Sequence, residues 1–262
     1  MKRYLQYYLR LFKLSLMSEM AYRENFWTWA IIHSVWLLTM ILFFKIVFQG
    51  TVNINGWSEY QTLLVLGTGT LITGLGSLTF FPFMYNFGKD IQKGDLDAKL
   101  TKPLDIHFQS AFHWIDTEDL IVVPNSLVLI AYATFKLNPP HLALNIIGYT
   151  LLLISSLVIL FSVLTLIQSL ALKFIKVDTV ANFYWSVVNI GKYPAKAIKS
   201  VSVLASILLI PIAVISSVPA EVLFGRYEPQ WIIGSFVSAL VLLWFSRWVF
   251  MSSLRHYSSA SS

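Results

Sequence analysis

The sequence predicts an all-α, polytopic membrane protein, a helical bundle with six transmembrane helices, an N-terminal amphipathic interface helix and a short cytoplasmic helix. Hydrophobic residues make up 56% of its 262 residues and charged residues only 12%, whereas a soluble domain carries about 25% charged residues. The mean hydropathy is +0.68. Apolar runs of membrane-spanning length alternate with short polar segments, so we expect a single transmembrane domain over residues 1–262.

Residues 1–25 are predicted to form the amphipathic helix. Its apolar face carries Leu5, Tyr8, Leu9, Phe12, Leu16 and Met20, and its polar face carries Arg3, Gln6, Arg10 and Lys13. Such a helix lies in the membrane interface with its basic face toward anionic headgroups. It acts either as a surface anchor or as an elbow that moves with the first span.

Six apolar runs approach the roughly 20 residues that a helix needs to cross the hydrocarbon core. They are Phe26–Phe48, Tyr60–Phe87, Leu120–Phe135, Leu142–Leu172, Val201–Val218 and Trp231–Phe250. The third run is the shortest, and three acidic residues crowd its start. We expect one of them, Asp119, to cap this span.

The basic residues indicate how the chain is oriented. Of the 19 Lys and Arg residues, 16 fall in the two termini and in the segments after the second and fourth spans, and only Lys45, Lys136 and Arg226 fall on the opposite side. The positive-inside rule then places both termini in the cytoplasm. We expect the protein to lie in the inner (cytoplasmic) membrane. The net charge of +6 therefore reflects topology, and we expect no nucleic-acid partner.

Residues 88–119 form a polar cytoplasmic loop with the signals of a short helix. Gly94 can end the preceding helix, Asp95 is a suitable N-cap, and Pro103 stops the new helix. Leu96 and Leu100 lie four residues apart and share a face. The loop is either a docking element for another protein, with both leucines in the partner's groove, or a plain interfacial connector.

The outer loop between the last two spans is apolar although prolines interrupt it. Pro219 and Pro229 bracket Val222, Leu223 and Phe224. Residues 219–230 form either a re-entrant segment that dips into the membrane or an ordinary outer loop.

The loop segment from Ile91 through Gly94 to Leu104 resembles the G-x-L-D-x-x-L-x-K-P-L pattern of a group of ATP-binding-cassette (ABC) exporter permeases. These are six-span membrane subunits of the type-2 exporter superfamily. The resemblance extends to the basic N-terminus ending in AYRENFWTW and to the closing R-x-Y-S-S-A-S. It implies that the loop is a coupling helix that docks on an ATPase, through Gly94, Asp95, Leu96, Asp97, Leu100, Lys102 and Pro103.

The resemblance also implies a separate ABC ATPase subunit that binds ATP and magnesium, and a second permease in a homodimer or heterodimer within the lipid bilayer. The chain itself contains no G-x-x-x-x-G-K-[ST] loop and no cysteine. We therefore expect a transport subunit and not an enzyme, with no catalytic residue, cofactor or metal in this chain. Its aromatic, weakly charged spans favour an amphipathic or hydrophobic substrate.

Two features of the spans allow a packing or a gating interpretation. Gly67, Gly69, Gly74 and Gly76 in the second span have the small-residue spacing of close helix contacts, and the small-residue face is also a candidate dimer contact. His33 is alone in the first span, where it is either a neutral packing residue or a functional group. The alternatives for the whole chain are a stand-alone ion-coupled carrier, a membrane-embedded enzyme, or a non-transporting scaffold.

Overall fold

The computed structural model describes residues 2–21, 23–54, 56–112, 114–174 and 215–255. These residues are almost entirely helical, with one isolated β-bridge between Ile54 and Trp57. In chain order the helices are α1 (Lys2–Ala21), α2 (Arg23–Phe48), α3 (Glu59–Thr79), α4 (Pro82–Lys93), α5 (Asp95–Leu100), α6 (Ile106–Ala111), the 3-10 helix η1 (Glu118–Ile121), α7 (Val122–Leu137), α8 (Leu142–Phe174) and α11 (Pro229–Leu254). Residues 215–223 are also helical.

Within the described residues, five segments are long and apolar enough to cross a membrane. They are Arg23–Phe48, Glu59–Lys93, Asp119–Leu137, Leu142–Ser169 and Pro229–Leu254. Five of the six predicted spans are thus found, including the short third one. The predicted fifth span, Val201–Val218, lies outside the described residues except for its helical last part, residues 215–218.

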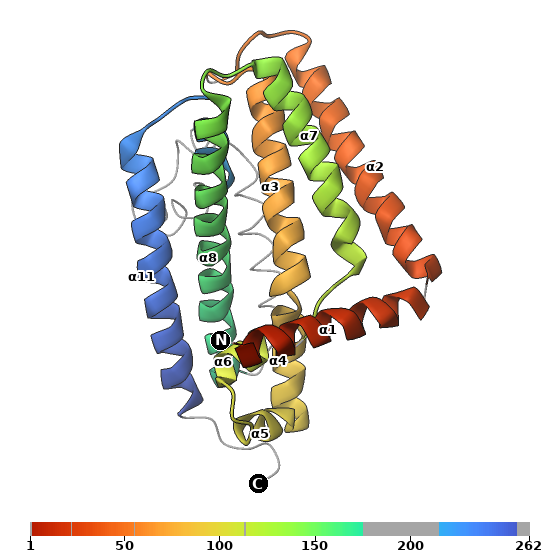
Figure 1. Cartoon of the computed structure of the whole chain (residues 1–262), viewed down its shortest axis with the longest axis vertical. Coiled ribbons are helices and arrows are strands. Elements are labelled where there is room, and N and C mark those ends of the chain that lie inside the picture. Colours follow the sequence, from red (N-terminus) through yellow and green to blue (C-terminus); the bar gives the residue numbers. More distant parts are fainter. Residues whose placement is uncertain (1, 22, 55, 113, 175–214, 256–262) are drawn as a thin grey trace.

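The α3 helix forms the centre of the bundle, and its flanks contact α2, α7 and α8 (Figure 1). It begins with a capping box, in which the Ser58 hydroxyl accepts from the Gln61 N–H and the Gln61 side chain accepts from the Ser58 N–H. The run Glu59–Lys93 is interrupted at Phe80 and Phe81, after which Pro82 opens α4. Proline fits the first turn of a helix because its missing N–H is unneeded there.

The α8 and α11 helices pair along their lengths on one flank of the bundle (Figure 1). Residues 215–223 pack against α8 in the same region. The Ser156 hydroxyl donates to the Ile215 carbonyl at 2.7 Å, and the Asn145 amide donates to the Leu223 carbonyl at 3.1 Å. This short helix is buried throughout. It ends before the turn at residues 224–225 that leads into α11. A re-entrant segment at residues 219–230 stays a prediction.

The α1 helix lies crosswise at the end of the bundle that carries α5, here called the α5 end (Figure 1). It contacts α6 through aromatic rings: Tyr4 and Phe108 have centroids 4.8 Å apart, and Tyr8 and Phe112 6.1 Å apart. Leu5, Leu9 and Met20 stay exposed. The apolar face predicted for α1 therefore has two environments. Tyr8 contacts the rest of the protein, whereas Leu5, Leu9 and Met20 point away from it.

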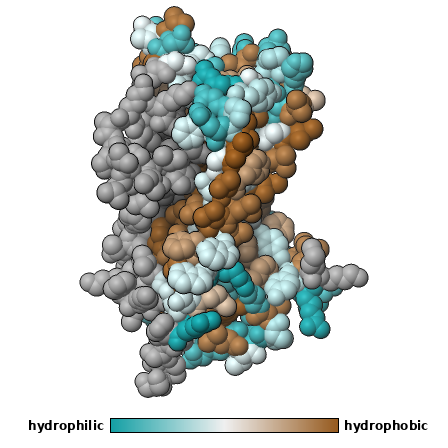
Figure 2. Space-filling model, turned by 90° about the vertical axis from the view of Figure 1, so that its left-hand side faces the viewer, coloured by the Kyte–Doolittle hydropathy of each residue, from teal (hydrophilic) through white to brown (hydrophobic). Residues whose placement is uncertain are grey.

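Exposed side chains on the flank of α11 are strongly apolar. Figure 2 shows a hydrophobic band in the described part of this face, with hydrophilic side chains gathered above and below it. The exposed apolar residues of α11 are Ile233, Phe236, Val237, Leu240, Val241, Trp244, Phe245 and Trp248. Such a band bordered by polar ends is what a lipid bilayer requires of a protein surface.

Candidate functional site

The polar loop predicted from the sequence folds into a corner made by α4, α5 and α6, here called the α4–α6 module. Gly94 ends α4 and begins α5 with a positive φ of 77°. A Cβ at this position would meet no atom within 4 Å, so a side chain would fit. Glycine is favoured here because residues with a side chain rarely adopt this left-handed backbone conformation. The predicted helix stop at Gly94 is confirmed.

The predicted N-cap role of Asp95 is wrong, because Gly94 occupies the N-cap position of α5. Glycine has no side chain, so α5 begins without a side-chain cap. Asp95 is instead the first residue of α5, and Asp97 follows it in the first turn, where negative charge interacts favourably with the helix dipole. The helix ends at Leu100, before Lys102 and Pro103, as the proline predicts.

The two leucines of α5 have different environments. Leu96 is 0% exposed and belongs to the same core as Phe87, Ile91 and Ile106, whereas Leu100 is 47% exposed. The expectation that both enter a partner's groove is therefore wrong for Leu96. The Leu96 side chain packs the short α5 helix against α4 and α6, whereas the Leu100 side chain lies at the surface of the molecule.

A buried ion pair joins α5 to α4. The Lys99 ammonium lies 2.5 Å from an Asp90 carboxylate oxygen, and both residues are buried. The Gln109 amide of α6 donates to the Lys99 carbonyl at 3.3 Å and to the Leu104 carbonyl at 2.8 Å. Removing one member of a buried ion pair is strongly destabilising, so these contacts fix the three helices relative to one another.

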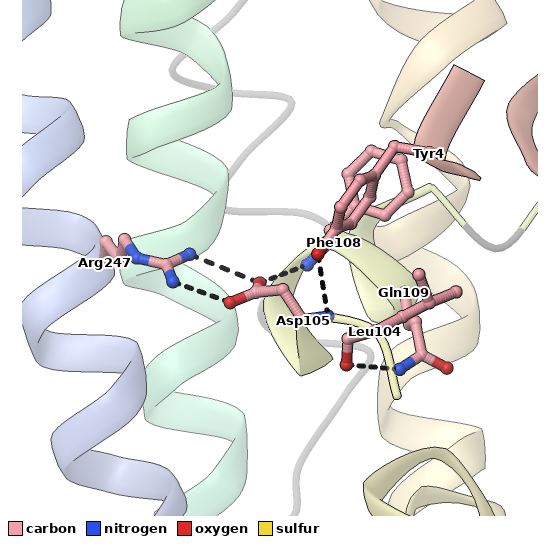
Figure 3. Close-up of polar contacts among 6 residues, drawn as sticks. All are labelled: Tyr4, Leu104, Asp105, Phe108, Gln109 and Arg247. Carbon is pink, nitrogen blue, oxygen red and sulfur yellow. Dashed lines mark hydrogen bonds and ion pairs between the residues drawn. The ribbon is translucent and has the colours of Figure 1, made fainter. Parts of the chain in front are cut away.

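A second ion pair joins the module to the last span (Figure 3). Asp105 caps α6 by accepting from the Phe108 N–H at 2.9 Å, and its two carboxylate oxygens accept from the Arg247 guanidinium of α11 at 3.3 and 2.6 Å. The Asp105 N–H donates to the Tyr4 hydroxyl at 3.4 Å. One residue therefore connects α6 to α11 and to α1.

The electrostatic setting of Asp105 and His107 supports this geometry. Partial burial alone would raise the pKa of Asp105, but the hydrogen bonds from Arg247 and the Phe108 N–H outweigh it and lower that pKa. Burial, aided by the nearby Arg247 charge, lowers the pKa of His107 to about 4. His107 is thus neutral at pH 7 and packs between Phe161 and Phe250, with its Nε2 3.1 Å from the Thr165 hydroxyl of α8.

The outer side of the module is a polar surface with an apolar edge. A hollow of about 280 Å³ is lined by Asn86, Lys89, Asp90, Lys93, Asp95 and Trp114. The Trp114 ring is exposed beside it, as are Leu100 and Lys102 at the end of α5. The described residues contain no group of three His, Cys, Asp or Glu side chains able to hold a metal ion.

The profile of a known family, described as ABC-2 family transporter protein, matches residues 34–261. The chain belongs to the ABC-2 transporter family. No curated protein and no solved structure matches the chain. The family and the five apolar spans together make this chain a multi-pass membrane permease component of an ABC transporter.

Two of the four glycines, Gly67 and Gly74, pack α3 against α7 of the same chain. A Cβ on Gly67 would lie 2.9 Å from Ile130, and one on Gly74 would lie 2.9 Å from Val122. Gly76 approaches Phe81, and Gly69 is buried. The small-residue face is thus occupied within one chain, so it does not support a dimer contact as expected from the sequence.

His33 is not an isolated packing residue in the ABC-2 transporter protein. Its Nε2 lies 2.7 Å from a carboxylate oxygen of Asp119, and its ring stacks on Trp29. The expected capping role of Asp119 is wrong, because Asp119 lies within η1 and α7 has Ile121 at its N-cap. The carboxylate faces α2 instead.

Four residues that build the site were not singled out from the sequence, namely Asp90, Asp105, Gln109 and Arg247. Two of them had a usable signal. Asp105 lies two residues after the helix-stopping Pro103 and is a favoured N-cap type. Arg247 is a charge within the last span, where a polar partner is expected by default. For Asp90 and Gln109 no local pattern indicated burial.

Proposed function

We propose that this chain is the permease subunit of an ABC exporter, and that a separate ATPase subunit docks on its α4–α6 module. The docking surface consists of the exposed end of α5, with Leu100, Lys102 and Pro103, together with Asp95 and the polar hollow next to it. ATP and magnesium bind to the partner subunit, and this chain provides the substrate path. The family membership and the resemblance of residues 94–104 to the coupling pattern support the proposal.

The observation that carries it is the way the module is tied to the spans. Lys99–Asp90 joins α5 to α4, which together with α3 forms the apolar run Glu59–Lys93. Asp105–Arg247 joins α6 to α11, and His107 lies against Thr165 of α8. A plain connector loop needs none of these contacts. A displacement applied to α5 would therefore move three spans together instead of being absorbed by a flexible loop.

The transport step in this proposal involves no covalent chemistry in the permease. The ATPase pair closes on binding ATP, moves the module and shifts the spans between two states that bind the substrate with different affinity. Two permeases enclose the path. Both termini and the α5 end face the cytoplasm, as the basic residues indicate, and tag accessibility in sealed cells would test this orientation.

The docking test uses the leucine that is exposed. Replacing Leu100 with Asp and Lys102 with Glu removes apolar contact area and reverses a charge, so binding of the ATPase subunit should weaken at least tenfold, or about 1.4 kcal/mol. The measurement is co-purification of a co-expressed ATPase from the permease's gene neighbourhood, together with transport-coupled ATP hydrolysis. The matched control, Ser18→Asp, adds a carboxylate to the exposed part of α1 and should bind normally.

Leu96 requires a separate variant because it is a core residue. Leu96→Ala should destabilise the module by about 2–5 kcal/mol and lower coupling indirectly, with less permease recovered.

If Leu100→Asp/Lys102→Glu permease, folded and inserted, still binds the ATPase and couples like the native chain, the α5 surface is not the docking site.

A further inference from the structure

A hollow of about 330 Å³ opens between α2, α3 and the start of α7, here called the α2–α3–α7 hollow. Ile32, His33 and Trp36 of α2 line one side, and Thr73 and Ser77 of α3 and Asp119 of η1 line the others. It lies toward the α5 end of the spans, because Asp119 is the first residue of the span Asp119–Leu137 and that span leads away from the module. The coupling surface does not include it.

The hollow contains an ionisable pair at the α5 end of the membrane-spanning region. His33 Nε2 and Asp119 Oδ1 are 2.7 Å apart, and their side chains keep 32% and 20% of their exposure. Ionisable groups in a membrane span are costly and mark binding or transport sites by default.

The charges of the lining select the sign of a ligand. The described lining has one carboxylate, Asp119, and one imidazole, His33, and it has no Lys or Arg. An anionic group entering the hollow would meet the Asp119 carboxylate with no fixed positive charge to offset it. A cationic group would replace the imidazole as the partner of Asp119. The Trp36 indole in the same lining adds a π-face of the kind that attracts ammonium groups.

The surroundings also provide for an apolar tail. A second hollow of about 360 Å³ between α2 and α7 shares Leu37 and Asn125 with the first. Its lining is mostly apolar, with Leu38, Ile41 and Val128 among its residues, and Lys45 is the basic residue in it. A charged recognition point next to an apolar hollow matches a molecule with a polar head and an alkyl chain.

We propose that the α2–α3–α7 hollow binds the ammonium headgroup of a cationic amphipathic molecule. Asp119 is its counter-ion, Trp36 contacts the ammonium through its ring, and His33 occupies the place of the ligand in the empty state. The alkyl chain lies in the adjoining hollow. The binding site stands on its own geometry, and its assignment as the entry site of an exported substrate rests on the proposed function.

The test measures binding to the full-length chain in nanodiscs without any ATPase. The probe is radiolabelled dodecyltrimethylammonium, and unlabelled dodecanoate and tetramethylammonium are the competitors. We expect Asp119→Asn to weaken binding at least tenfold and Asp119→Glu to restore most of it. Trp36→Leu should weaken binding about threefold or more. His33→Leu should tighten binding, because the imidazole no longer competes with the ammonium group for Asp119. Dodecanoate should not compete, and tetramethylammonium should compete at least tenfold less well than the amphipath.

Matched variants separate the site from general effects. Glu24→Gln removes an acidic residue from the start of the same helix, and Trp244→Leu removes an exposed indole from α11. Both should bind the probe like the native chain. Native-like binding by folded Asp119→Asn, competition by dodecanoate, or tetramethylammonium competing as well as the amphipath would each overturn the proposal. Because no ATPase is present, a negative result here leaves the docking proposal untouched, and failure of docking leaves this site untouched.

Discussion

At the residue scale, paired polar groups hold the α4–α6 module in place. Asp90 pairs with Lys99 in a buried position, whereas the pair of Asp105 and Arg247 is more exposed. Exposed pairs contribute about 1 kcal/mol or less to stability, so Asp105–Arg247 matters for the geometry it imposes on α6 and α11. The neutral His107 ring beside it fills an aromatic cluster that includes Phe161 and Phe250.

His107 should make stability fall at acidic pH. Its pKa in the folded protein is about 4, below the value of about 6.5 for an unfolded chain. The unfolded state therefore binds more protons between these values, and stability decreases as the pH falls from 6.5 toward 4. The full effect is about 3 kcal/mol. It should be seen in Tm measured in detergent between pH 7.5 and 4.5.

The variant His107→Gln keeps a polar group near Thr165 but does not titrate. The difference in Tm between native chain and variant should change by roughly 5–10 °C over this pH range. His141→Asn, at an exposed position, serves as the control and should follow the native chain. An identical pH profile for His107→Gln and the native chain would contradict the buried neutral imidazole.

The pair of Asp105 and Arg247 should affect coupling more than stability. Asp105→Asn keeps a capping side chain for α6 and loses the ion pair, so we expect Tm to change by only a few degrees. Coupled ATP hydrolysis should fall several-fold while the ATPase still co-purifies. Arg247→Gln should give the same loss, and the double variant should be no worse than either single one. Additive losses would show that the two residues act separately.

At the element scale, α3 is a rod that connects the centre of the bundle to the module. Its apolar run continues through the break at Phe80 and Phe81 into α4, which ends at Gly94. Close packing of α3 on α7 at Gly67 and Gly74 fixes where this rod lies. The α5 helix has only six residues and depends on Leu96 and Lys99 for its position, because isolated helices of this length are unstable.

Side chains at two glycines should have opposite effects. A Cβ on Gly74 would lie 2.9 Å from Val122, while a Cβ on Gly234 of α11 would meet no atom within 4 Å. Gly74→Leu should therefore destabilise the protein by about 1–3 kcal/mol or more through overpacking. Gly234→Leu should be neutral or stabilising by up to about 1 kcal/mol through helix propensity. The measurement is thermal unfolding of both variants, and equal Tm values would refute the α3–α7 contact.

At the scale of the whole molecule, the described spans are unequally buried. The α3 helix is enclosed, whereas α2 is the least buried span and exposes Ile31, Leu42 and Ile46. A helix with so little contact to its own bundle has room for a partner. We place the proposed contact with a second permease on α2, because the glycine face of α3 is already occupied by α7.

The natural absence of cysteine allows a direct test of this contact. Native mass measurement in nanodiscs should show two permeases per particle, and Leu42→Cys on α2 should form an oxidative crosslink between them. Phe135→Cys, exposed on α7, should not crosslink. A particle with one permease and full transport activity would exclude the dimer.

The local signals in the sequence predicted much of the fold. Apolar length located the five described spans, Gly94 and Pro103 bounded α5, and the residues around them carried the family resemblance. Such signals are local because span length, positive φ and the restriction before proline are properties of a few neighbouring residues. Most of the predicted fifth span lies outside the described residues, and six spans remain a prediction.

The sequence by itself determined that this chain is an all-α membrane protein of the ABC-2 kind, and where its polar loop begins and ends. Only the tertiary structure decided which loop residues are buried and which are exposed. Leu96 and Leu100 have the same chemistry and helical spacing, yet one is in the core and the other is exposed. The pairs His33–Asp119 and Asp105–Arg247 join residues 86 and 142 positions apart in the sequence. Contacts at such separations depend on how the helices pack together, and no local pattern in a single sequence encodes that.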